Sequence, residues 1–355
     1  MNTRHYDTIV FLDIKKLLPF VLILLTVGAV FAQDPQFSQY YQSPLYLNPG
    51  FTGITNQQRA TFIHRNQWPN LPQAFSTFAA SYDVWVDEIR SGIGILATTD
   101  RAGTAGWRTT TVGLNYSYKV RLTEKFVFSP GIYFGYGING LDRSRLLTYG
   151  DGLEFGGETL DPLNPRLGSA QYFDIGTGFI LYNKDLFLGA AFSHINTPNL
   201  SILSTETRLP MKTIVHGGGR ITLRKGIRTT ARPTYLTPSF VYRVQGLISQ
   251  MDVGVNYHVD PVSIGLWYRG KPWESTILNT VQQDAFIFVL GIYLKNISLG
   301  YSYDFNTSGL ATASGGAHEI SVVYEFESRP LRKGAKKRNK LIPCPSFNSK
   351  PGFWN

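Results

Sequence analysis

The residues ISLGYSYDF (297–305) alternate without a break between two kinds of side chain. Large apolar or aromatic residues occupy the odd-numbered positions, and small or polar residues occupy the even-numbered ones. Successive side chains of a β-strand point to opposite faces, so this period of two predicts a strand with one apolar face. The other face carries serine, glycine and Asp304, whereas a water-exposed sheet face usually carries more lysine and glutamate. The stretch therefore favours a strand of a membrane β-barrel over one of a soluble sandwich.

The same alternation recurs along most of the chain. It is clear in Met251–Tyr257 and in Ile320–Phe326, where only Val323 interrupts it. Strands are expected at 59–68, 77–86, 92–99, 108–118, 125–139, 171–182, 186–194, 212–224, 236–244, 248–258, 262–269, 284–295, 297–305 and 317–326. The sequence thus predicts an all-β fold, a transmembrane outer-membrane β-barrel of about 14 antiparallel strands.

The connectors between these strands alternate in length. Short turns near 87–91, 183–185, 259–261 and 296 fall on one side, and long connectors at 140–170, 195–211, 270–283 and 306–316 fall on the other. Outer-membrane barrels have short periplasmic turns and longer surface loops, which sets the expected orientation. Connectors 225–235 and 245–247 break the rule, so counts of twelve or sixteen strands stay open. The 140–170 connector could serve recognition, constrict the pore or simply cover the mouth of the barrel.

Composition agrees with a membrane barrel. Charged residues make up 16% of the 355 residues and aromatic residues 14%, whereas about 25% charged residues is usual for soluble domains. Aromatic side chains recur near predicted strand ends, where they would suit the lipid headgroup level. These are Trp68, Trp85, Trp107, Tyr118, Trp267, Tyr268, Tyr324 and Phe326.

The formal net charge of +10 comes mostly from the C-terminal end. Basic residues without acidic neighbours follow Glu327, and the segment 328–355 is interpreted as a flexible basic periplasmic tail. The residues expected to give it an electrostatic role are Arg329, Arg332, Lys333, Lys336, Lys337, Arg338 and Lys340. The tail would be a solvated end, or it would contact anionic lipid or an acidic periplasmic partner. Such clustering argues against a nucleic-acid partner.

The N-terminal end has the features of a signal peptide. Lys15 and Lys16 precede an apolar run that ends at Phe31, and Ala32 provides the small residue before the cut. We expect cleavage after Ala32, export, and residence in the outer membrane. The predicted organisation is a signal peptide (1–32), an N-terminal signature segment (33–58), the barrel (59–327) and the tail (328–355).

No pattern of residues indicates catalysis, a metal or a cofactor. The histidines of the mature chain lie on separate predicted strands, without HExxH spacing. The glycine clusters 217–219 and 135–137 lack the lysine and following helix of a phosphate loop, and glycines inside strands permit close packing in the lumen. Asp284 and Asp304 could face each other across neighbouring strands, in a structural role. The lone Cys344 fits no zinc or nucleophile motif. We therefore expect no enzyme.

The segment 33–53 is too interrupted to cross a membrane and too aromatic to stay free in water. Asp34 followed by Pro35 predicts a helix start, Ser43 followed by Pro44 predicts its end, and Asn48-Pro49-Gly50 predicts a turn. On such a helix, the aromatic side chains at 37, 40 and 41 would share one face. We expect the segment to plug the periplasmic mouth of the barrel, with its glutamines and Asn48 bonded to the polar wall. A periplasmic partner is the alternative resting place.

This segment resembles the hallmark of the PorP/SprF family, which follows a signal peptide with DPxFSQ(Y/F)Y, PLYLNP and F.G. The matching positions are Asp34, Pro35, Phe37, Ser38, Gln39, Tyr40, Tyr41, Pro44, Leu45, Tyr46, Leu47, Asn48 and Pro49. We expect these residues to make the plug or partner contacts. The resemblance implies an outer-membrane component of Bacteroidetes type IX secretion and gliding motility, without catalytic residues or cofactors.

The same resemblance implies a role and partners. The role is to help deliver or anchor secreted cell-surface proteins such as adhesins. The partners are cargo proteins with C-terminal sorting domains, periplasmic ring and motor components, and outer-membrane lipid. A passive channel or transporter of hydrophobic substrates stays open as the alternative, because about fourteen strands suit both roles.

Overall fold

The computed structural model describes residues 34–55, 57–71, 75–103, 106–141, 169–202, 206–224, 234–270, 285–307 and 314–326, all within the compact unit Asp34–Asn355. The predicted signal peptide, the basic tail with the seven basic residues named above, Asp284 and most of the 140–170 connector lie outside the described residues. Between 34 and 326, no described helix has the length and apolarity to cross a membrane.

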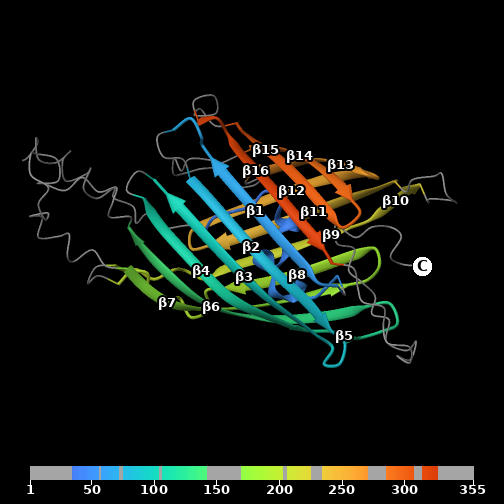
Figure 1. Cartoon of the computed structure of the whole chain (residues 1–355), viewed down its shortest axis with the longest axis horizontal. Coiled ribbons are helices and arrows are strands. Elements are labelled where there is room, and N and C mark those ends of the chain that lie inside the picture. The colour runs from blue at the N-terminus through green and yellow to red at the C-terminus, as the bar shows by residue number, and fades with distance from the viewer. Residues whose placement is uncertain are drawn as a thin grey trace, which may run out of the picture. The chain divides into compact units, whose positions relative to one another are not determined.

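Within the described residues, antiparallel strands form one closed ring (Figure 1). The strands are β1 (Arg59–Gln67), β2 (Phe75–Val86), β3 (Ser91–Ala102), β4 (Trp107–Tyr118), β5 (Val120–Arg121), β6 (Val127–Leu141), β7 (Ser169–Tyr182), β8 (Leu186–Ser193), β9 (Lys212–Gly219), β10 (Ile221–Arg224), β11 (Thr234–Gln245), β12 (Ile248–Val259), β13 (Val262–Gly270), β14 (Ala285–Leu294), β15 (Ile297–Asn306) and β16 (Ala317–Glu325). Pairing of β1 with β16, from Arg59 opposite Glu325 to Gln67 opposite Ala317, closes the ring.

The described ring has 14 strands, which confirms the predicted count. The short β5 and β10 continue β4 and β9 along their neighbours β6 and β11 and add no position to the ring. The predicted strand 212–224 is interrupted at Arg220, whose backbone N–H donates to Asp185 O at 2.7 Å. The connector 246–247 joins β11 to β12. It is short although it lies at the end of the barrel with the long connectors, as the sequence indicated.

Side chains alternate between the two faces of the barrel wall. On β4 the outward residues Val112, Leu114 and Tyr116 are 46%, 61% and 44% exposed, whereas the intervening Asn115 and Ser117 are buried. An apolar outside and a polar inside are the arrangement of a membrane barrel. Ring closure also pairs the backbone polar groups that an open sheet edge would leave unsatisfied in lipid.

Two of the aromatic residues expected at the headgroup level point inward instead, so the prediction is wrong for Trp85 and Trp267. Trp85 is 9% exposed, and its indole lies 4.0 Å from Lys119 Nζ. Trp267 is 3% exposed and donates to Asn256 Oδ1 at 3.2 Å. Both occupy the inward phase of their strands, and inside the barrel each indole finds a polar partner.

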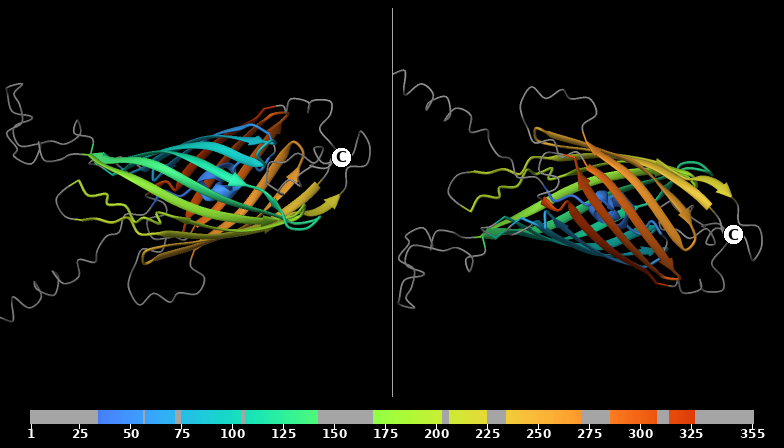
Figure 2. Two further views of the ribbon diagram at one scale, coloured as in Figure 1. Left: turned by 90° about the horizontal axis from the view of Figure 1, so that it is seen from below. Right: turned by 90° about the horizontal axis from the view of Figure 1, so that it is seen from above.

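The N-terminal segment, residues 34–55, lies inside the ring (Figure 2). It contains three short helical turns: η1 (Tyr40–Gln42), α2 (Pro44–Leu47) and η2 (Pro49–Phe51). The predicted helix from Asp34 is absent, because the Asp34 side chain bonds to the wall instead of capping a helix. Pro44 begins α2 at its first position. The predicted turn at Asn48 is confirmed, since its side chain accepts the Gly50 N–H at 2.8 Å.

The segment runs along the barrel rather than across one mouth. Asp34 contacts His194, Lys212 and Gln245, which lie where β8 ends, β9 begins and β11 ends. All three positions are at the end with the long connectors. Gly53 contacts Asp83 and Lys119 near the short turns. The expectation that the mature N-terminus docks at the short-turn mouth is therefore wrong, because the charged partners of Asp34 lie at the opposite end.

Glycines in the wall make room for this segment. A methyl group added at Gly131 on β6 would lie 2.4 Å from the backbone carbonyl carbon of Pro49. One added at Gly92 on β3 would lie 2.1 Å from Thr52 O. Backbone atoms cannot move aside as a flexible side chain can, so only glycine permits the observed approach at these positions. The expectation that strand glycines permit close packing in the lumen is confirmed here.

Gly131→Ala should loosen the segment while the barrel assembles. Overpacking costs about 1–3 kcal/mol, so a cysteine introduced by Ser43→Cys, in a Cys344→Ser background, should react with a water-soluble maleimide about tenfold faster. Gly176→Ala is the matched control on β7, because its added methyl group comes no closer than 3.2 Å to its nearest neighbour, Phe192 O. Equal labelling rates in both variants would contradict the packing described here.

Candidate functional site

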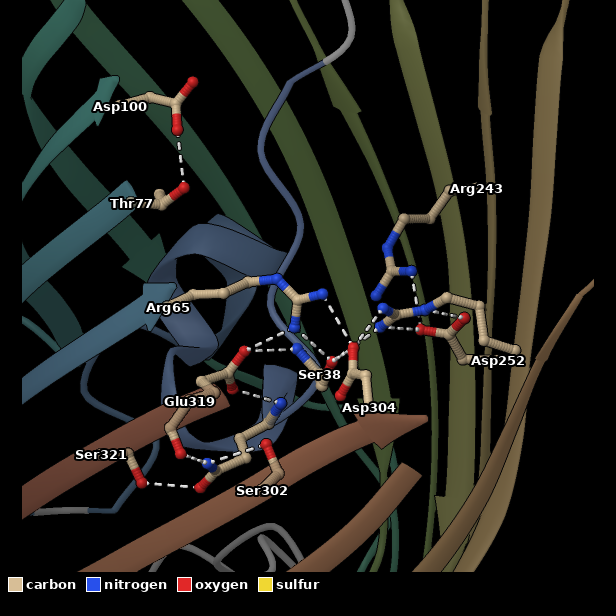
Figure 3. A network of polar contacts seen from close by, with 12 residues as sticks. Ser38, Arg65, Thr77, Asp100, Arg243, Asp252, Ser302, Asp304, Glu319 and Ser321 are labelled. Atoms are coloured by element: carbon tan, nitrogen blue, oxygen red, sulfur yellow. Dashed lines mark hydrogen bonds and ion pairs between the residues drawn. The ribbon is translucent and has the colours of Figure 1, made fainter. Parts of the chain in front are cut away.

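Ser38 is the centre of a buried polar network inside the barrel (Figure 3). Its Oγ donates to Asp304 Oδ2 at 2.7 Å and accepts from Arg65 Nη1 at 2.7 Å and Arg269 Nη2 at 3.0 Å. These partners come from β15, β1 and β13. A serine hydroxyl offers one donor and two acceptor sites, and all three are used.

The backbone next to Ser38 is bound by Glu319 on β16. The Ser38 and Gln39 N–H groups donate to the two carboxylate oxygens at 2.8 Å and 2.6 Å. The Gln39 side chain donates to Ser302 Oγ at 3.2 Å and accepts from Ser321 Oγ at 2.7 Å. The irregular backbone here thereby obtains the hydrogen bonds that buried N–H groups require.

The network extends along the wall through alternating charges. Arg269 bonds Asp252 through Nε at 3.1 Å, and Arg243 Nη1 bonds the same carboxylate at 2.8 Å. With Arg65, Asp304 and Glu319, three arginines face three carboxylates, and each residue is buried. Removing one member of such a set leaves an uncompensated buried charge, which is strongly destabilising. The network therefore joins strands around the ring to each other and to the N-terminal segment.

Asp34 forms a second ionic contact. Its Oδ2 lies 2.7 Å from His194 Nε2 and also bonds Lys212 Nζ, and His194 Nδ1 lies 2.9 Å from Asp174 Oδ1. Burial raises the pKa of Asp34, but the positive charges of His194 and Lys212 outweigh it and hold the pKa well below its usual range. Burial lowers the pKa of His194, but the charge of Asp34 and the hydrogen bonds that the imidazole donates to Asp174 and Asp34 raise the pKa to about 9. At neutral pH this contact is a charged ion pair.

Asn48 attaches the middle of the segment to the opposite wall. Its Nδ2 donates to the carbonyl oxygens of Phe179 at 3.1 Å and Ala190 at 3.0 Å, and it lies 2.9 Å from His216 Nε2. Phe51 stacks on the His216 ring with centroids 5.3 Å apart. Asn48 thus uses its side chain both for its own turn and for two strands, β7 and β8.

The aromatic residues of the segment pack inside the barrel. Phe37 meets Tyr46 edge to face at 5.2 Å between ring centroids, and Tyr40 meets Trp267 in the same way at 5.2 Å. Phe37, Tyr40, Leu45 and Leu47 are each at most 5% exposed. The apolar side chains that a free segment would expose to water are covered by the lumen wall and by one another.

The structure brings the predicted signature residues together along the lumen. Asp34, Ser38, Gln39 and Asn48 make polar contacts with the wall. Tyr41 is partly buried beside Tyr40. The backbone oxygen of Pro35 accepts from the Tyr46 hydroxyl at 2.6 Å.

The wall residues that meet the signature residues were not among the predicted site. Arg65, Lys212, Arg269, Glu319 and His194 bond the segment directly, and Arg243 and Asp252 extend the network from Arg269. Each of the six strand residues lies on the inward phase of its strand, and that phase is the signal that could have identified them. Asp304 pairs with Arg65 and Arg269, a structural role. In the part of the chain that the structure describes, no group of three or more His, Cys, Asp or Glu side chains could hold a metal ion.

Ser38→Ala should lower the free energy of unfolding by about 1–3 kcal/mol, because it leaves buried arginine donors and a carboxylate short of one partner each. Ser43→Ala is the matched control. Ser43 is 1% exposed, compared with 2% for Ser38, and its Oγ has no hydrogen-bond partner. Urea unfolding of the purified barrel in detergent measures both. A loss of the same size for the two variants would contradict the role assigned to the Ser38 network.

The Asp34–His194 ion pair should weaken in alkali. The pKa of His194 is raised from 6.5 to about 9, so its contribution to stability is complete below pH 6.5 and disappears as the pH rises through about 9. The unfolding free energy of the wild type, minus that of His194→Gln, should decline over this window. A difference that stays constant from pH 6 to pH 10 would show that His194 is not protonated against Asp34.

Solved structures similar to this chain include a mutant Rh. blastica porin, at 8% identity over 76% of this chain and 99% of that chain with a TM-score of 0.32. They also include the P. putida toluene transporter TodX, at 9% identity over 79% and 93% with a TM-score of 0.45. BamA from Haemophilus ducreyi lacking POTRA domains 1–3 matches at 8% identity over 76% and 70% with a TM-score of 0.38.

The search of curated proteins finds no match. The family model for the type IX secretion system membrane protein PorP/SprF matches residues 29–324, which includes the whole lumenal segment and nearly all of the ring. This chain therefore belongs to the PorP/SprF family of type IX secretion system membrane proteins.

Proposed function

We propose that this protein is an outer-membrane accessory barrel of the type IX secretion and gliding machinery. In this role it helps to deliver or anchor secreted cell-surface proteins such as adhesins, after export and cleavage of residues 1–32. Family membership and the outer-membrane type of barrel support the setting in the secretion system. The role requires binding and positioning and no reaction chemistry, so no catalytic residue is assigned.

The observation that carries the proposal is the attachment of the N-terminal segment to opposite walls of the lumen. A barrel of this many strands encloses more space than its inward side chains can fill. Ser38 and Gln39 bind β15 and β16, whereas Asn48 binds β7 and β8. Bridging the lumen in this way supports a plug, and a plug favours a scaffold for protein partners over an open channel.

The expected partners follow from the proposed setting. Cargo proteins with C-terminal sorting domains would approach from the end with the long connectors. Periplasmic ring and motor components would contact the end with the short turns. The basic tail beyond residue 327 would add an electrostatic contact on that same side, with an acidic partner or with anionic lipid.

Deleting residues 34–53 should open the barrel. In a planar lipid bilayer the wild-type protein should show little conductance, and the deletion variant should conduct ions, because the bridging segment is gone. The control is Arg121→Gln, an exposed change near the short turns that leaves the lumen intact. A large resting conductance of the wild type would contradict the plug and would support a passive channel.

Affinity isolation from membranes in mild detergent tests the secretion role separately. Cargo or secretion-machinery proteins should remain bound to the intact protein. Their absence, together with transport of small hydrophobic solutes, would instead support the alternative of a hydrophobic-substrate transporter.

A further inference from the structure

The outward face of the barrel changes character along β3 and β4. Ile93 and Ile95 on β3 and Leu114 on β4 are exposed at 43%, 43% and 61%, as suits contact with lipid hydrocarbon. Toward the long connectors, Thr99 and Thr110 follow on the same face, with their hydroxyl oxygens 2.8 Å apart. On β3 and β4 the apolar band ends at these threonines. Phe78 on β2 and Ile138 on β6 lie in the same row and are still apolar and exposed, so this row is the last level of the hydrocarbon band.

Immediately beyond the threonines, two arginines stand side by side. Arg101 on β3 and Arg108 on β4 are direct cross-strand partners, and both are exposed. Like charges directly opposite each other in a sheet are destabilising, and an anion bound between them would offset their repulsion. Two positive charges held together at the edge of the lipid band therefore favour the binding of an anion.

The described residues around the arginine pair do not supply that anion. Arg108 Nε donates to Thr99 Oγ1 at 3.4 Å. The neighbours in the same row are Ser76 on β2 and Gly140 on β6, neither of them acidic. Asp100 lies next in sequence but on the lumen side, where it accepts from Thr77 Oγ1 at 2.6 Å. Among the described residues, no carboxylate pairs with either arginine.

We propose that Arg101 and Arg108 bind the phosphate group of a phosphorylated lipid in the leaflet at the long-connector end, which is the outer leaflet. A guanidinium fork matches phosphate oxygens in bidentate geometry, so two adjacent forks can hold one phosphate group from two sides. The exposed apolar residues Ile93, Ile95 and Leu114 below the pair would receive the acyl chains. The place of the site, on the lipid-facing surface, commits it to a lipid rather than to free phosphate.

Such a site would set how the barrel sits in the membrane. A lipid phosphate bound at one point of the circumference would fix the depth of the barrel in the membrane. This inference concerns the lipid-facing surface of the barrel and does not depend on whether the N-terminal segment acts as a plug.

Native mass spectrometry of the detergent-solubilised protein with added diphosphoryl lipid A tests the site. The double variant Arg101→Gln and Arg108→Gln should bind the lipid about tenfold or more weakly than the wild type. The matched control is Arg121→Gln with Lys125→Gln, which removes two exposed positive charges near the short turns. Heat-modifiable gel mobility confirms that each variant is a folded barrel.

Two results would overturn the proposal. One is an equal loss of lipid A binding in both double variants, which would show only a general effect of charge. The other is displacement of lipid A from the wild type by equimolar inorganic phosphate, which would show that the lipid surface plays no part. Unchanged binding of dephosphorylated lipid A to all three proteins is the expected companion result.

Discussion

The contact between Ser38 and the charged wall is the interaction on which the lumen depends. Arginines and carboxylates placed inside a membrane barrel are tolerated only when every one of them is paired and hydrogen-bonded. Ser38 supplies bonds to Arg65, Arg269 and Asp304, and the backbone at Ser38 and Gln39 satisfies Glu319. The wall charges thus require the N-terminal segment, and the segment requires the wall charges. The signature residues of the N-terminal segment and the charged residues of the barrel wall therefore stabilise each other.

The ring was predictable because lipid imposes a simple rule on the sequence. Outward residues must be apolar and inward residues small or polar, so the period of two persists along most of the strands and indicates their positions. Within the ring, the wrong predictions concern two aromatic residues near strand ends. Tryptophan is a residue type typical of the membrane interface, yet the position of Trp85 and Trp267 in the alternation places both side chains inside the barrel. Reading the phase of each aromatic residue together with its proximity to a strand end would have corrected both assignments.

Of the two sets of residues that meet in the lumen, only those of the N-terminal segment were predictable. Segment residues could be identified because Asp34, Ser38, Gln39 and Asn48 lie in a compact motif. Their partners are spread over strands far apart in sequence, and only the register of a closed ring brings them together. The local structure of the segment was also beyond the sequence signals. Asp34 followed by Pro35 is a sound helix start in isolation, but the ion pair with His194 and Lys212 competes for the same carboxylate and also sets the direction of the chain.

The most direct test of the account is amide hydrogen exchange at Ser38 and Gln39 in the intact, folded protein. These N–H groups donate to the Glu319 carboxylate deep in the lumen, so they should exchange as slowly as the amides of β15 and β16, although they belong to no strand. Exchange at the rate of an unstructured peptide would contradict the account, because it would mean that the segment is not held inside the barrel.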